Sequence, residues 1–352
     1  MLYMEELLKQ AKQMGASDLH ITVGVPPILR INGELQHLEA EKMLPEKTSE
    51  IVNSIMTEKQ KNHFEKHGEI DFSFSISTVG RFRVNAFKQR GSVAAAFRLV
   101  DSVIPDPEKI GLPPSVRQLY MKKRGLILVT GPTGSGKSTT LASLIGEINR
   151  NRSSHIITLE DPIEYLHSHK KSIVNQREMG LDSQGYAQAL RAVLRQDPDV
   201  ILVGEMRDLE TISIAITAAE TGHLVLSTLH TTGAVSTIDR IIDVFPPHQQ
   251  QQIRIQLSGV LQAVVSQQLI PTKDNLGRVA AFEVLHINQA VRNLIREQKS
   301  HQILSVMQTN KRIGMQTMED AILELLREDM ITKEDALSFS TDTAGMERRL
   351  NG

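Results

Sequence analysis

Cysteine and tryptophan are absent from this chain of 352 residues, and only 4% of its residues are aromatic. Without cysteine the protein can form no disulfide, no thiolate zinc site and no cysteine nucleophile. Net charge is nearly absent as well, since 40 Lys and Arg residues face 41 Asp and Glu residues and leave a formal charge of −1. Because nucleic-acid binders usually carry a basic surface or stacking rings, we expect no nucleic-acid partner.

Long apolar runs are also missing. No run approaches the ~18 apolar residues that a helix needs to cross a bilayer, so we expect no transmembrane segment. The N-terminus carries acidic residues at Glu5 and Glu6 and has no basic segment before an apolar stretch, so it does not read as a signal peptide. The sequence therefore predicts a cytoplasmic protein that is at most peripheral to a membrane.

The hydrophobic pattern divides the chain into four parts. Residues 1–100 alternate short strands with helices, which predicts an α+β domain with an antiparallel sheet. The four prolines within residues 101–114 predict a linker. Residues 115–290 alternate continuous apolar runs with helix-length segments, which is typical of a doubly wound α/β domain with a parallel sheet. We predict a helical region over 291–352, of which 341–352 is loosely ordered.

The segment 131–138 matches the phosphate-binding pattern G-x-x-x-x-G-K-[ST] in full. A buried strand precedes it and a helix-compatible segment follows it. In such a loop successive backbone N–H groups surround the β-phosphate, Lys137 reaches the β- and γ-phosphates, and the Ser138 hydroxyl binds Mg²⁺. The guanine-reading N-K-x-D motif of GTPases is missing. We therefore predict ATP and Mg²⁺ as cofactors, with the nucleotide bound by Gly131, Pro132, Thr133, Gly134, Ser135, Gly136, Lys137, Ser138 and Thr139.

Carboxylates follow two of the predicted parallel strands. Glu205 ends one strand at the position of the residue that polarises the attacking water, whereas Gly204 stands where such strands usually place a metal-binding Asp. Glu160 and Glu164 follow another buried strand. We predict that these two acids hold Mg²⁺ and water, with Glu164 as the metal ligand. The alternative is an acidic helix start that the helix dipole stabilises.

One histidine and two arginines complete the candidate site. His230 ends a further strand among hydroxyl side chains, where it can sense the γ-phosphate. Arg83 and Arg98 lie in strands of the N-terminal domain. These arginines either face solvent or reach the ATP of a neighbouring subunit as arginine fingers, and their positions leave both interpretations open.

Together these motifs resemble the secretion ATPases of the type II and type IV pilus superfamily, in which Gly also replaces the strand-end Asp. The segment Ala290–Glu297 is similar to the Ala-Ile-Arg-Asn-Leu-Ile-Arg-Glu motif of the pilus-retraction branch, with one Val for Ile. The resemblance covers essentially the whole chain and is carried by residues 17–20, 131–138, 158–164, 190–199, 204–205 and 221–232.

The resemblance implies a homohexameric ring in which a PAS-like domain precedes a RecA-like ATPase domain. It also implies that Arg83 and Arg98 are paired arginine fingers. In the helix over 290–297 we expect Leu294 and Ile295 to face inward and Arg292 and Arg296 to face outward, together with Glu297.

The implied function is a Mg²⁺-dependent ATPase that powers type IV pilus retraction by moving its domains. It would act on an inner-membrane platform protein from the cytoplasmic face of the membrane. Three alternatives stay open: an accessory retraction motor or an extension motor of the same superfamily, a RecA-like DNA translocase, and a nucleotide-binding scaffold that does not hydrolyse ATP.

Overall fold

The structure is a computed structural model that describes residues 2–31, 33–76, 79–100 and 103–351. Its contacts separate two compact units. One comprises Met1–Val103 and the short segment Pro162–Leu166, and the other comprises Ile104–Asp161 and His167–Gly352. The predicted linker begins with Asp101 and Ser102, which lie outside the described residues. The bounds of the predicted linker and domains therefore stay predictions.

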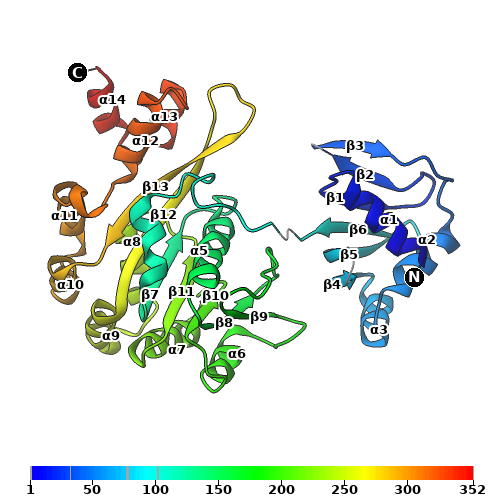
Figure 1. The fold of residues 1–352 in the computed structure, drawn as a ribbon, viewed down its shortest axis with the longest axis horizontal. Helices are drawn as coiled ribbons and strands as arrows, with labels where there is room; N and C mark the ends of the chain where they lie inside the picture. Colours follow the sequence, from blue (N-terminus) through cyan, green and yellow to red (C-terminus); the bar gives the residue numbers. More distant parts are fainter. Residues whose placement is uncertain (1, 32, 77–78, 101–102, 352) are drawn as a thin grey trace. The chain divides into compact units, whose positions relative to one another are not determined.

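The N-terminal unit is a six-stranded sheet with helices (Figure 1), and its strand order is β3-β2-β1-β6-β5-β4. All neighbouring strands run antiparallel, so the predicted antiparallel α+β domain is confirmed. Along β5 alternate residues are buried in one core, whereas Arg83 points away from it. The elements are α1 (Leu2–Gln13), β1 (Asp18–Ile21), β2 (Ile28–Ile31), β3 (Glu34–His37), α2 (Pro45–Ser54), α3 (Glu58–His67), β4 (Glu69–Ile76), β5 (Gly80–Gln89) and β6 (Ser92–Leu99).

The C-terminal unit contains a seven-stranded sheet with the order β13-β12-β7-β11-β10-β8-β9. The strands from β12 to β9 run parallel, and β13 runs antiparallel to β12 at one edge. The predicted parallel α/β sheet is therefore confirmed, with one antiparallel strand added. The strands are β7 (Gly125–Thr130), β8 (His155–Glu160), β9 (Ile173–Glu178), β10 (Val200–Val203), β11 (Leu224–Leu229), β12 (Leu261–Pro271) and β13 (Arg278–His286).

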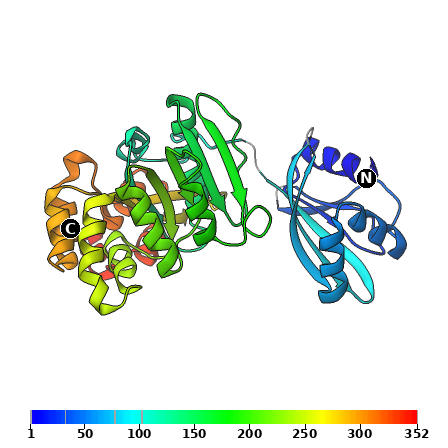
Figure 2. The same ribbon diagram turned by 90° about the horizontal axis from the view of Figure 1, so that it is seen from below.

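Both faces of this sheet are buried, as Figure 2 shows for the helices that flank it. Leu126 and Leu128 of β7 pack in the core cluster of α6 to α10, while Ile127 and Val129 pack in the cluster of α4 and α5. A strand covered on both faces has no polar side, which explains its continuous apolar run. The flanking helices are α4 (Pro114–Arg117), α5 (Lys137–Asn151), α6 (Tyr186–Val193), α7 (Leu209–Glu220), α8 (Ala234–Asp243), α9 (Pro247–Val260) and α10 (Gln289–Arg296).

The region after α10 is helical, as predicted, and it includes a helix within the range 341–352 that was expected to be loosely ordered. Residues 343–351 form a helix, and Met346 is fully buried in a small core with Ile322 and Ala336. Only Met346 and Leu350, one helical turn apart, mark this contact, so the sequence pattern there is weak. The helices are α11 (Ile303–Thr309), α12 (Met318–Arg327), α13 (Lys333–Phe339) and α14 (Thr343–Asn351).

The helix α10 differs from the expectation at one arginine. Ile295 is fully buried and Leu294 is half-buried, whereas Arg296 and Glu297 are exposed, as predicted. The prediction that Arg292 faces outward is wrong. Its guanidinium donates to the backbone carbonyls of Gly259, at 2.7 Å, and of Ser258 at the C-terminal end of α9. Arg292 thus satisfies carbonyls that the end of a helix leaves unpaired.

No helix in the described part of the chain combines the length and the apolar content that crossing a membrane requires.

Candidate functional site

The phosphate-binding loop joins the end of β7 to the start of α5. Gly131, Gly134 and Gly136 have positive φ angles of 141°, 78° and 87°, which favour glycine. Gly136 is the N-cap residue of α5, so the loop leads into a helix whose first N–H groups have no partner within the helix. This is the backbone geometry that binds an anion.

Gln267 of β12 lies directly beneath the loop and explains two of its glycines. A Cβ atom on Gly131 would lie 2.2 Å from the Gln267 carbonyl oxygen, and one on Gly136 would lie 2.8 Å from the Gln267 Nε2. The Gln267 side chain is itself held, because its Oε1 accepts a hydrogen bond from the Thr140 hydroxyl at 2.7 Å. The loop therefore packs so closely on β12 that side chains at these two positions would collide with it.

The polar groups of the loop fit a bound phosphate. Lys137 is only 8% exposed, and its Nζ donates to the carbonyls of Gly131 and Pro132 at 2.9 Å each. The Ser135 hydroxyl is buried without a hydrogen-bond partner among the described residues. A buried ammonium, an unpaired hydroxyl and the start of a helix together favour an anionic ligand with several oxygens.

A cavity of about 760 Å³ adjoins the loop at Gly136, Thr139 and Thr140. Leu269 and Arg278 of the β12–β13 hairpin also line it. The volume is in the range of small-molecule sites, so the cavity beside the loop has room for a nucleoside.

His230 follows β11 and connects the loop to Glu205. Its Nδ1 lies 3.5 Å from Lys137 Nζ and 3.4 Å from the Thr133 hydroxyl, and its Nε2 lies 3.3 Å from Glu205 Oε1. Because an ammonium can only donate, we assign Nδ1 as the acceptor and Nε2 as the protonated nitrogen that donates to Glu205. One imidazole thus joins the phosphate-binding loop to the predicted water-activating carboxylate.

Glu205 is held in its carboxylate form by a second partner. Its Oε2 lies 2.7 Å from an Arg207 guanidinium nitrogen, and its side chain is 16% exposed. Burial alone would raise the pKa of Glu205, but the hydrogen bonds from Arg207 and His230 and the charge of Arg207 outweigh it and lower the pKa below its ordinary value. Glu205 therefore stays able to accept a hydrogen bond from water at neutral pH.

Glu160 ends β8 beside the strand that precedes Glu205. It accepts hydrogen bonds from the Thr158 hydroxyl at 2.5 Å and from Gln176 Nε2 at 3.1 Å. A Cβ on Gly204 would lie 3.4 Å from the Glu160 Cα, so the ends of the two strands are in contact. The structure thus brings Glu160, Glu205, His230 and the loop to one edge of the sheet, where the carboxyl ends of parallel strands meet.

The close contact between these strand ends also explains why glycine occupies position 204. A Cβ there would lie 2.9 Å from the Tyr186 hydroxyl and 3.0 Å from the Leu159 carbonyl oxygen. Burial and the charges of Asp161, Glu205 and Glu160 raise the pKa of Tyr186 well above its ordinary value, so this hydroxyl stays protonated among the acids.

Ser138 and Glu164 are the residues predicted to hold a metal ion. Among the residues that the structure describes, no group of three or more His, Asp or Glu side chains is arranged to hold a metal. Ser138, half-buried at the start of α5, is placed as such loops place a Mg²⁺ ligand. Glu164 is exposed and belongs to the segment that groups with the N-terminal unit, so its role as a metal ligand stays a prediction.

Arg83 and Arg98 are directly opposite each other on β5 and β6. Arg98 pairs with the buried Asp18 at 2.9 Å, and Arg83 lies 4.0 Å from Asp71. Both arginines remain largely exposed, on the face of the sheet that points away from its core. Their role as arginine fingers stays a prediction.

Three residues of the site were not predicted from the sequence. Gln267, Tyr186 and Arg207 approach the loop, Gly204 and Glu205 through the folding of the chain. Only Arg207, two residues after Glu205, had a local signal.

Comparison with known proteins relates the whole chain to one family. The family model described as type II/IV secretion system protein matches residues 1–337. The type IV pilus retraction ATPase PilT of Pseudomonas aeruginosa is 48% identical over 331 residues, which cover 94% of this chain and 96% of that protein. A twitching motility protein of Neisseria gonorrhoeae is 49% identical, with 91% and 86% of the two chains covered.

A solved structure, of the pilus retraction motor PilT with bound ADP, has a similar fold. It is 54% identical, covers 97% of this chain and 98% of its own, and superimposes with a TM-score of 0.90.

Proposed function

The chain belongs to the type II/IV secretion system protein family, and on that premise we propose that it is an ATP-hydrolysing motor that retracts type IV pili. The observation that carries the chemistry is the His230 imidazole between Lys137 of the loop and Glu205. The direction of drive is supported by the relative named as a retraction ATPase, which aligns with nearly the entire chain.

The loop binds ATP through backbone N–H groups and Lys137, and the adjoining cavity accepts the nucleoside. Glu205 orients and polarises the attacking water, and its low pKa keeps it in the basic form. His230 holds Glu205 from the side of the loop, where it can respond to the γ-phosphate beside Lys137 and Thr133. Bound Mg²⁺ would neutralise charge on the phosphates, and Ser138 and Glu164 are the residues that would hold it.

The proposal includes the assembly in which the motor works. Six copies form a ring, and Arg83 and Arg98 of one subunit reach the ATP of the next. Hydrolysis moves the two units of each chain relative to each other. This motion drives a platform protein at the cytoplasmic face of the inner membrane. The exposed position of both arginines on the N-terminal sheet supports this part of the proposal.

Hydrolysis by the purified protein tests the site. Lys137→Ala removes the buried ammonium and should abolish ATP binding. Glu205→Ala should preserve ATP binding but lower kcat by at least about a hundredfold, because a positioned general base contributes at least that much. Full turnover by either folded variant would contradict the site.

Deleting the gene and counting surface pili tests the direction of drive. Persistent pili on cells that no longer twitch are expected for a retraction motor. A loss of pili would instead show an extension motor of the same family, even if hydrolysis behaved as described.

A further inference from the structure

Glu283 of β13 is a buried carboxylate outside the site described above. Glu283 is only 8% exposed, and its two carboxylate oxygens accept hydrogen bonds from backbone N–H groups at the starts of two helices. Oε1 accepts from the Ala234 N–H at 2.6 Å, and Oε2 accepts from the Met318 N–H at 3.3 Å. Ala234 is the first residue of α8 and Met318 is the first residue of α12, so one side chain caps both helices.

The first of these helices determines where His230 lies. Only residues 231–233 separate His230 from α8, and they are anchored from below. The Gly233 N–H donates to the Ser266 hydroxyl at 2.9 Å, and the Thr231 and Thr237 hydroxyls are 2.7 Å apart. Together with the bond from Ala234 to Glu283, these contacts hold the base of the loop that carries His230.

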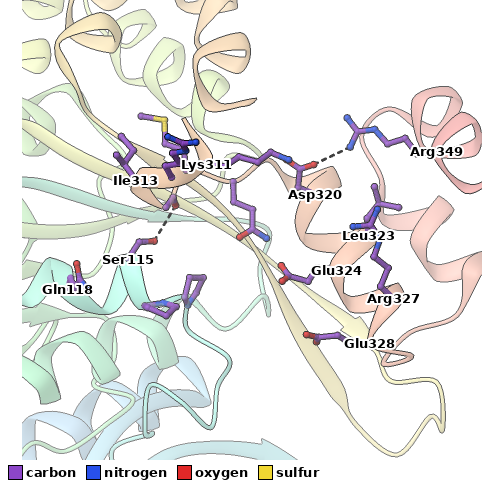
Figure 3. Close-up of a pocket in the computed structure, with 16 residues that line it drawn as sticks. Ser115, Gln118, Lys311, Ile313, Asp320, Leu323, Glu324, Arg327, Glu328 and Arg349 are labelled. Atoms are coloured by element: carbon purple, nitrogen blue, oxygen red, sulfur yellow. Dashed lines mark hydrogen bonds and ion pairs between the residues drawn. The ribbon is translucent and has the colours of Figure 1, made fainter. Parts of the chain in front are cut away.

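The second helix belongs to the C-terminal core. Met318 packs with Ile322 of the same helix and with Met346 of α14. On its other side α12 supplies Asp320 and Glu324, which Figure 3 shows at a cavity of about 1240 Å³. Glu283 therefore joins the helix that follows His230 to a helix of the C-terminal region.

Burying a carboxylate costs free energy, and in Glu283 burial raises the pKa above its ordinary value. Two backbone N–H groups and two helix dipoles offset that cost only while both helix starts stay in place. If either helix moves, an oxygen of Glu283 is left buried without a donor, which resists the movement.

We propose that Glu283 is a positioning residue for ATP hydrolysis. It holds the starts of α8 and α12 together and thereby fixes His230 against the phosphate-binding loop and Glu205. This inference rests on the proposed ATPase function and assigns Glu283 no contact with ATP.

The test compares Glu283→Gln with Thr332→Ala in the full-length protein. Glutamine keeps the size of the side chain but turns one accepting oxygen into an NH₂ group, so one helix start loses its acceptor. Thr332 caps α13 by accepting from the Asp335 N–H at 3.1 Å, and its loss should weaken the start of that helix without reaching the site.

For Glu283→Gln we expect kcat to fall between about tenfold and about a hundredfold, as when a catalytic group is slightly misplaced. The KM for ATP should stay within about twofold, since binding by the loop is intact. Amide hydrogen exchange should accelerate in residues 231–237. Thr332→Ala should leave kcat and this exchange unchanged, which separates positioning from a general loss of stability.

A folded Glu283→Gln protein with wild-type kcat and wild-type exchange at 231–237 would overturn the inference. An equal fall of kcat in Thr332→Ala would overturn it too, because stability alone would then explain the loss. If the wild-type protein hydrolysed no ATP, the proposed function would fail, and hydrogen exchange would still decide whether Glu283 holds the two helix starts.

Discussion

At the scale of single residues, the geometry of the site depends on positions where a side chain would come too close to a neighbour. Gly131 and Gly136 lie on the same glutamine of β12, but they meet different parts of it. Gly131 faces the backbone carbonyl of Gln267, which cannot move without distorting the strand. Gly136 faces the end of the Gln267 side chain, which can shift only by giving up its hydrogen bond from the Thr140 hydroxyl. The two glycines of the loop should therefore differ in how well they tolerate a side chain.

This difference gives a prediction for a matched pair of substitutions. Gly136→Ala should lower the free energy of unfolding by about 1–2 kcal/mol, the cost of a side chain at a left-handed φ. Gly131→Ala should lower it by about 1–3 kcal/mol more, because the new Cβ overlaps a backbone oxygen. Denaturant unfolding measures both. Equal losses would show that β12 adjusts to the loop more easily than the close contact implies.

At the scale of elements, the sequence predicts strands and helices that have a regular hydrophobic pattern or a motif. It does not predict contacts between elements that are far apart in the chain. β7 and β10 were predicted because both faces of each strand are buried, and α5 because its phosphate motif marks its start. β3 was missed because all of its residues are exposed, so it shows no alternation. Gln267 and Tyr186 were missed because their contacts with the loop and Gly204 join elements far apart in the chain. Local patterns carry no information about such contacts.

The contact between α9 and α10 also joins separate elements and was not predicted from the sequence. Its contribution to stability can be tested. Arg292→Ala removes hydrogen bonds to the last carbonyls of α9 and should lower the free energy of unfolding by about 1.5–3 kcal/mol, the range for hydrogen bonds to a charged group. Arg296→Ala, one turn away on the exposed face, should change it by less than about 0.5 kcal/mol. Thermal or denaturant unfolding distinguishes the two. A small effect of Arg292→Ala would mean that water replaces the guanidinium at these carbonyls.

At the scale of the whole molecule, the proposed site is divided between chains. Lys137, Glu205 and His230 lie in one unit, whereas Arg83 and Arg98 lie in the other. If the arginines act on the ATP of a neighbouring subunit, each active site needs an intact ATPase unit from one chain and an intact N-terminal sheet from the next. Two inactive variants with defects in different units can then complement each other.

Mixing variants tests this division directly. Arg83→Ala alone should hydrolyse ATP slowly while binding it normally, and Glu205→Ala alone should be inactive. Mixed rings of the two should hydrolyse faster than either variant, because some sites combine an intact Glu205 with an intact Arg83. Mixing Glu205→Ala with Lys137→Ala is the matched control and should recover nothing, since both defects lie in the same unit. A mixture no faster than the average of its components would argue against action between subunits.

The close packing around Gly204 also constrains how this sequence can change over generations. The space that a strand-end aspartate needs is occupied by the Tyr186 hydroxyl and the Leu159 carbonyl. An aspartate at position 204 would require the end of the Tyr186 side chain to move and the Leu159 carbonyl to shift by a few tenths of an ångström. These neighbours therefore disfavour a carboxylate at position 204. Descendants of this chain are expected to vary elsewhere in the site before they recover a carboxylate at position 204.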